Sequence, residues 1–169
     1  MLSERLLGAF DDQIELEFYS AHAYLSIAAY FEDLNLPGFV NWSKIQFDEE
    51  VSHAMKLFDF VHDRGNRVTL HGIDKPPADW ASPIDAMQQA LQHERKVTAA
   101  IHDLYEASVE GNDRAAQVLL QWFIEEQVEE EKAVEEIVDH LRIVGGDGTG
   151  LIVIDARLGE RTPEEDSAD

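Results

Sequence analysis

The chain has 169 residues, 44% of them hydrophobic, and its 35 acidic and 13 basic side chains give a formal net charge of −22. The apolar content is too high for a disordered acidic tail, and no apolar run approaches the roughly 20 residues of a membrane span. Too few Lys and Arg are present for a basic nucleic-acid-binding face, and the absence of cysteine excludes disulfides, thiolate catalysis and zinc–thiolate sites.

Apolar residues recur at spacings of three and four through most of the chain, which predicts helices and almost no strand. The first helix is predicted over residues 3–34 and ends at the breaker Asn35-Leu36-Pro37-Gly38. Pro37 suits the first turn of a second helix over residues 37–64, because its missing N–H would be unpaired there anyway. Gly65-Asn66 ends that helix.

A long connection rich in Gly and Pro follows over residues 65–82. At its end, Ser82 provides an N-cap and Pro83 a first-turn residue, which together predict the start of a third helix over residues 83–110.

Gly111-Asn112 breaks the third helix, and a fourth helix is predicted over residues 113–144 up to Gly145-Gly146. A short apolar fifth helix is predicted over residues 151–158. The acidic tail, residues 162–169, is expected to be mobile.

The lengths of the connections predict the topology. Short loops make the first two helices one antiparallel hairpin and the next two another. A helix of about 28 residues is roughly 42 Å long, and the extended connection 65–82 can reach about 60 Å. We therefore predict one all-α domain over residues 1–169, a four-helix bundle with one long crossover and a short fifth helix.

Each of the four long helices carries one carboxylate in the middle of an otherwise apolar stripe: Glu17, Glu50, Glu94 and Glu130. His53 follows Glu50 by three residues, so both project from one helix face. Buried carboxylates are costly unless their charge is compensated, and several carboxylates with one imidazole suit iron or manganese. The alternative is that each acid lies at the solvent edge of its stripe, which is common for a single Glu but requires a coincidence in all four helices.

The acidic composition has two interpretations. It raises the local concentration of cations, or it is simply a soluble, self-repelling surface such as a salt-adapted organism would use. We expect a cytoplasmic protein, because the first residues lead into an amphipathic pattern without a signal-peptide core. The other histidines have no partner at clear ligand spacing and are interpreted as surface or core polar residues: His22, His62, His71, His93, His102 and His140.

The chain resembles a prokaryotic non-haem ferritin of the ferritin-like di-iron superfamily in four stretches, which are Glu17–Tyr24, Asp48–Met55, Glu94 and Gln121–Glu130. The resemblance extends over about residues 4–160. It implies a ferritin-like bundle that acts as a ferroxidase, oxidising Fe(II) to Fe(III) with O₂ or H₂O₂ at a di-iron centre. It also implies that the product is stored as ferric mineral inside a hollow protein shell.

The same resemblance implies the roles of individual residues. The first iron would be held by Glu17, Glu50 and His53, and the second by Glu94 and Glu130, with Glu50 as the bridge and Gln127 nearby. A third iron or transit site would comprise Glu49, Glu126 and Glu129. Tyr24 and Trp122 match aromatic residues beside the ferroxidase centre, although core packing alone also explains both.

Departures from related families limit the cofactors. The fourth helix has no histidine to make a second Glu-x-x-His pair, and Val51 stands where a bacterioferritin has its haem-binding Met. Without cysteine, rubredoxin-type iron is not expected either, so we expect neither haem nor a Cys-bound iron.

The short fifth helix is too short to be stable alone. In ferritins such a helix packs around a four-fold axis, so the resemblance implies a homo-oligomeric shell of 24 subunits and disfavours the twelve-subunit mini-ferritins. The entry route for iron stays open, because only Asp113 is acidic where animal ferritins have channel acids.

Two other functions remain as alternatives. A di-iron oxidase or peroxidase without storage would bind only two or three metal ions per chain. A purely structural bundle would bind no iron specifically.

Overall fold

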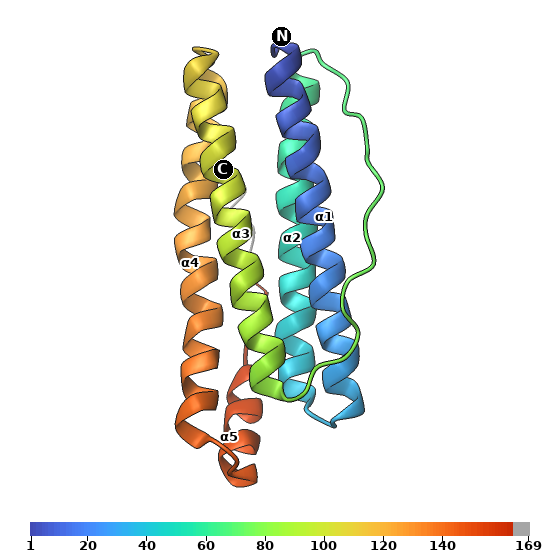
Figure 1. Cartoon of the computed structure of the whole chain (residues 1–169), viewed down its shortest axis with the longest axis vertical. Coiled ribbons are helices and arrows are strands. Elements are labelled where there is room, and N and C mark those ends of the chain that lie inside the picture. Colours follow the sequence, from blue (N-terminus) through green and yellow to red (C-terminus); the bar gives the residue numbers. More distant parts are fainter. Residues whose placement is uncertain (164–169) are drawn as a thin grey trace.

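Five α-helices make up the structure, a computed structural model that describes residues 1–163, and no strand occurs in that range (Figure 1). The helices are α1 (Glu4–Asp33), α2 (Pro37–Asp63), α3 (Pro83–Glu110), α4 (Arg114–Val144) and α5 (Gly148–Leu158). The first four lie side by side as a bundle and α5 lies at one end, which confirms the predicted fold class. Most of the tail predicted to be mobile, from residue 164 onward, lies outside the described residues.

The long connection between α2 and α3 runs the length of the bundle beside α1 (Figure 1). At one end the backbone N–H of Leu2 donates to Asn66 Oδ1 at 2.8 Å, and near the other the Ser26 hydroxyl donates to the Pro77 carbonyl at 2.5 Å. The predicted single crossover is therefore confirmed. It makes α3 run in the same direction as α2.

Side-chain caps fix where the last two helices begin. Asp113 accepts from the Ala116 N–H at 3.1 Å, so it precedes α4 as its N-cap and the helix begins at Arg114. Asp147 accepts from the backbone N–H groups of Thr149 and Gly150, and α5 begins at Gly148. The prediction that α5 starts at residue 151 was therefore three residues too late, because the cap holds the glycines in the first turn.

The apolar core is divided into two clusters, one toward each end of the bundle. One contains Phe31 and Phe39, and the other contains Phe10, Leu57 and Leu120. On each long helix the residues of the two clusters are separated by a buried polar segment. A polar layer therefore crosses the middle of the bundle.

The two hairpins approach each other unequally. α1 packs closely on α3, whereas no Cα of α2 lies within 8 Å of a Cα of α4 among the described residues. Long polar side chains bridge this wider side, as when Gln46 of α2 reaches Glu130 of α4. The α2–α4 side is thus the side on which the polar layer has room for further groups.

The fifth helix docks on the start of α2. A carboxylate oxygen of buried Asp155 accepts from the Phe39 N–H at 2.9 Å. A Cβ added at Gly38 would lie 1.6 Å from the Asp155 carbonyl oxygen, so only glycine allows this approach. Ile152 and Val153 remain 58% and 66% exposed on the outer face of α5.

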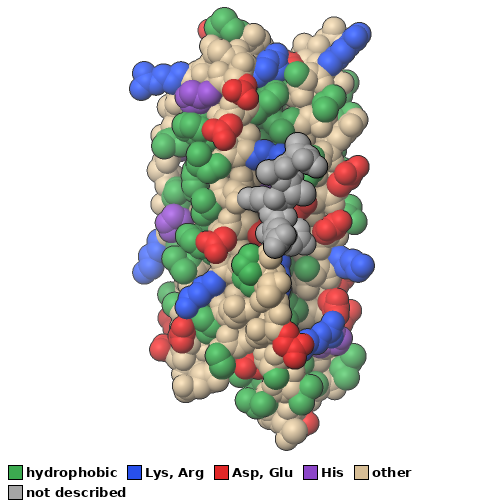
Figure 2. Space-filling view, turned by 180° about the vertical axis from the view of Figure 1, so that it is seen from behind, with side chains coloured by type: hydrophobic (Ala, Val, Ile, Leu, Met, Phe, Trp, Pro, Cys, Tyr) green, Lys and Arg blue, Asp and Glu red, His purple; other side chains and the backbone are tan. Residues whose placement is uncertain are grey.

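On the face shown in Figure 2, Lys and Arg are scattered among acidic and apolar side chains and do not gather into one patch. Within residues 1–163, no helix combines the length and the apolarity that crossing a bilayer requires.

The Gly38 contact predicts opposite effects of two Gly→Ala changes. Gly38→Ala should lower the free energy of unfolding by about 1–3 kcal/mol, because the new methyl group collides with α5 backbone. Gly8→Ala in α1 is the matched control: nothing lies within 4 Å of its Cβ position, and it should gain about 0.5–1 kcal/mol of helix stability. Thermal unfolding of both variants measures the difference. Equal stability of the two would contradict the close docking of α5.

Candidate metal centre

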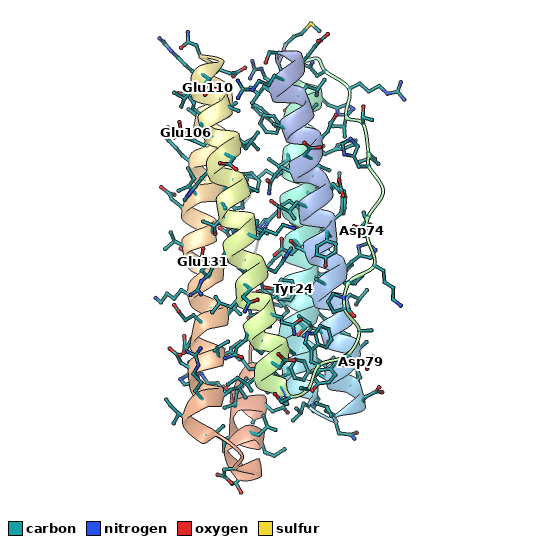
Figure 3. All side chains as sticks on the ribbon, viewed as in Figure 1. Tyr24, Asp74, Asp79, Glu106, Glu110 and Glu131 are labelled. Carbon is teal, nitrogen blue, oxygen red and sulfur yellow. The ribbon has the colours of Figure 1, made fainter. Side chains whose placement is uncertain are left out.

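The polar layer gathers one carboxylate from each long helix in the bundle interior. Glu17, Glu50, Glu94 and Glu130 are all buried, and each lies between the two apolar clusters along its own helix. Tyr24, labelled in Figure 3, lies among α1, α2 and α3 and belongs to the apolar cluster beside this layer. The structure therefore brings the four predicted acids to one depth of the bundle.

Glu17, Glu50 and His53 form one group whose ligand atoms all lie within 4.8 Å of one another. His53 Nδ1 is 3.5 Å from Glu50 Oε2. Glu17 Oε1 accepts from Gln13 Nε2 at 2.8 Å, while Glu17 Oε2 is buried with no hydrogen-bond partner. A buried carboxylate oxygen without a donor is costly, so this donor set fits a cation that would complete it.

A second group lies on the other side of the same imidazole. His53, Glu126 and Glu130 also have ligand atoms within 4.8 Å, and His53 Nε2 is 3.7 Å from Glu126 Oε1. Glu130 Oε2 accepts from Gln46 Nε2 at 2.6 Å. The two groups share His53, so the imidazole lies between two places where a cation would meet carboxylates.

Glu94 is held by neighbours on two other helices. The Tyr24 hydroxyl donates a short hydrogen bond to Glu94 Oε1. Gln127 Nε2 donates to Glu94 Oε2 at 3.3 Å and to Thr98 Oγ1 at 3.2 Å. In this arrangement Gln127 and Tyr24 fix the orientation of the Glu94 carboxylate.

The three acids that the resemblance assigns to a third site do not come together as one group. Among the described residues, neither Glu49 nor Glu129 belongs to a group of metal-ligating atoms within 4.8 Å. Glu129 is exposed, and Glu49 is paired with Arg161. Glu126 is placed instead beside His53.

Glu50, Glu94 and Glu130 hold protons more tightly than ordinary carboxyls. Burial, reinforced by Glu94 and Glu17, raises the pKa of Glu50 well above its ordinary value. Burial raises the pKa of Glu94 to about 7, and burial with the charge of Glu94 raises that of Glu130 to about 8. These shifts express the cost of collecting negative charge in an apolar core. A divalent cation would remove that cost.

The imidazole experiences opposing influences. Burial favours neutral His53, but its interactions with the carboxylates of Glu126 and Glu50, together with the negative charge of Glu17, outweigh burial and raise its pKa well above the ordinary value. Its ring packs edge-on against Trp122, with centroids 5.5 Å apart, and Lys56 Nζ lies 3.7 Å from the centre of the Trp122 ring. Trp122 thus covers the imidazole on its outer side.

Three residues that support these groups carried no predicted role: Gln13, Gln46 and Arg161. Gln13 and Gln46 each precede a predicted ligand by four residues on the same helix face, and that spacing could have identified them. Arg161 lies beyond α5, where no periodic pattern indicates its partner. His93 contacts Ser20 Oγ at 2.7 Å, and burial lowers its pKa to about 4.

Comparisons with known proteins identify the family of the chain. A family model described as a ferritin-like domain matches residues 7–144. A bacterial non-heme ferritin of Staphylococcus aureus (strain USA300) is 34% identical over 166 residues, which cover 98% of this chain and 100% of that protein. One from Bacteroides fragilis (strain 638R) is 36% identical over 161 residues, covering 95% and 100%.

Solved structures give the same result. An open pore ferritin from the hyperthermophilic archaeon Archaeoglobus fulgidus matches with a TM-score of 0.94 and 44% identity, over 96% of this chain and 99% of that one. A humanized archaeal ferritin matches with a TM-score of 0.96 and 43% identity, over 98% and 100%. The resemblance inferred from the sequence is therefore confirmed, and the chain belongs to the ferritin family.

Proposed function

We propose that this protein is a ferroxidase that stores its product. It oxidises Fe(II) to Fe(III) with O₂ or H₂O₂ at the buried polar layer and keeps the Fe(III) as ferric mineral inside a hollow shell. The observation that carries the proposal is the pair of carboxylate groups that share His53 between two apolar clusters. The proposed ligands are Glu17, Glu50, His53, Glu94 and Glu130, with Gln127 and Tyr24 orienting Glu94.

Two Fe(II) substrate ions held side by side explain why the layer needs several acids. Each ion gives one electron, so a pair reduces one O₂ to one H₂O₂, or one H₂O₂ to two water molecules, and either reaction consumes two protons. Binding of cations favours the ionised carboxylates, so Glu94 and Glu130 lose the protons that their raised pKa values retain. The same residues that neutralise the iron therefore release protons beside the oxidant.

The ligand chemistry supports passage of iron in preference to permanent retention. Carboxylates bind through one or two oxygens and can bridge, so they accommodate both Fe(II) and Fe(III). Only His53 offers nitrogen among these ligands. Glu126 is partly exposed beside His53, and we propose that it leads iron outward past Glu49 and Glu129, the implied third or transit site.

The exposed outer face of α5 supports the proposal of a shell. Ile152 and Val153 are exposed there, and a helix this short gains stability from a partner surface. We propose a homo-oligomer of 24 subunits around this contact, as the resemblance implies. The absence of haem and the cytoplasmic location stay predictions.

Removing central ligands should abolish fast iron oxidation. Glu50→Ala removes the carboxylate that the resemblance implies as the bridge, and His53→Ala removes the residue common to both groups, so initial Fe(II) oxidation should slow more than about 100-fold in each. Stopped-flow absorbance after mixing apo protein with Fe(II) and O₂ measures the rate. Glu106→Gln, an exposed acid on α3 (Figure 3), is the control and should keep the wild-type rate. Wild-type rates in both central variants would exclude this centre.

The raised carboxyl pKa values predict how stability depends on pH. Glu94 and Glu130 move from an ordinary value of 4.5 to about 7 and about 8 on folding, so the folded metal-free protein binds extra protons. Their stabilising contribution is complete below pH 4.5 and is lost as the pH rises through 7 and 8.

Melting temperatures of chelator-treated protein should therefore fall across this range, and a divalent cation should restore them at the upper end. The double variant Glu94→Gln with Glu130→Gln should show a flatter profile than wild type, whereas Glu106→Gln should not. An unchanged slope in the double variant would show that other groups govern the pH dependence.

Storage is tested by loading apo protein aerobically with Fe(II) far beyond site stoichiometry, followed by size exclusion with iron and protein measured separately. Soluble iron should co-elute with a large assembly at far more than three atoms per chain. Iron that stops at two or three atoms per chain, while the rest precipitates, would instead indicate a di-iron oxidase without storage.

A further inference from the structure

The segment that follows α5 also contacts the bundle. After Leu158 it turns back along the bundle (Figure 1), and Asn41 Nδ2 of α2 donates to the backbone carbonyl oxygens of Leu158 at 3.3 Å and Arg161 at 3.0 Å. This anchorage places the Arg161 guanidinium 5.3 Å from the ring centre of Trp42. Arg161, held against α2 in this way, thus reaches the polar layer.

The guanidinium of Arg161 binds two residues of the layer at once. Its Nη2 lies 3.0 and 2.8 Å from the two carboxylate oxygens of Glu49, and its Nη1 donates to Gln46 Oε1 at 2.5 Å. Gln46 is fully buried. A contact that includes a buried amide is more specific than an ordinary surface ion pair.

The hydrogen bonds run in one direction from Arg161 into the centre. A guanidinium has no acceptor, so the Gln46 carbonyl oxygen must face it and the Gln46 amide nitrogen must face away. That nitrogen donates to Glu130 Oε2 at 2.6 Å. Arg161 is therefore linked through one side chain to an acid of the group around His53.

A cation at Glu49 would need the oxygens that Arg161 now holds. Two positive groups cannot share this carboxylate closely without repulsion. The ion pair is nevertheless replaceable, because the side chains of Arg161 and Glu49 are 25% and 20% exposed and water can solvate the released guanidinium.

We propose that Arg161 is the built-in occupant of the Glu49 carboxylate and that a third cation binds there only by displacing it. This inference rests on the proposed function, since it concerns iron beyond the two central ions. It makes Arg161 a residue that sets how tightly the outer position holds iron. By linkage, a cation bound at Glu49 loosens Arg161 to the same degree.

The test measures binding of Zn²⁺, a redox-inert probe, to the full-length apo protein by equilibrium dialysis. The ion of interest is the one lost on Glu49→Gln. In Arg161→Gln this Glu49-dependent ion should bind on the order of tenfold more tightly than in wild type. In the double variant Arg161→Gln with Glu49→Gln the gain should vanish.

Arg157→Gln is the matched control. Arg157 lies on the same terminal segment and pairs with Glu136 at 2.5 Å, so its removal changes the net charge equally without touching Glu49. It should leave the Glu49-dependent affinity within about twofold of wild type. A tenfold gain in this control as well would assign the effect to net charge and overturn the proposal.

Arg161→Lys separates charge from hydrogen-bond geometry. Lysine keeps the charge but loses the planar fork that reaches Gln46 and Glu49 together, so its Zn²⁺ affinity should fall between those of wild type and Arg161→Gln. Equal third-ion affinity in wild type and Arg161→Gln, with both central ions bound, would overturn this inference alone. Failure of wild type to bind the two central ions would instead contradict the proposed function.

Discussion

The constraint on which this structure depends is the burial of several carboxylates in one layer of a helix bundle. Apolar packing on either side excludes the water that would otherwise solvate these charges. The fold compensates in part with donors, as Gln13 supplies Glu17 and Tyr24 supplies Glu94. It leaves one Glu17 oxygen without a donor and shifts carboxyl pKa values upward. The layer is thus organised to bind a cation.

The alignment of the two hairpins along their length brings one acid from each helix to matching depth. The crossover spans the bundle, so α2 and α3 run in the same direction, and its contacts at Asn66 and Pro77 fix both of its ends. Because α1 and α3 pack closely while α2 and α4 stay apart, the layer is closed on one side and bridged by polar side chains on the other.

The local sequence pattern was sufficient to predict the helices, the crossover and the four central acids, because helical periodicity and loop length depend only on residues that are close together in the sequence. Glu50 and His53 were equally accessible, since a three-residue spacing fixes a shared face. Sequence could not place Glu126 beside His53, because that contact depends on how α2 and α4 approach. Nor could it reveal Arg161, whose partners Gln46 and Glu49 lie more than 110 residues earlier in the chain.

The docking of Asp155 has a consequence for the order in which the molecule is made. α2 has no capping side chain of its own at Leu36, and the acceptor for the Phe39 N–H comes from α5. A nascent chain that contains only α1 and α2 therefore lacks the acceptor for this N–H. The Phe39 N–H of the helix that carries Glu50 and His53 gains its protein acceptor only after synthesis has passed residue 155, so in a chain truncated before α5 this first-turn donor is left to water.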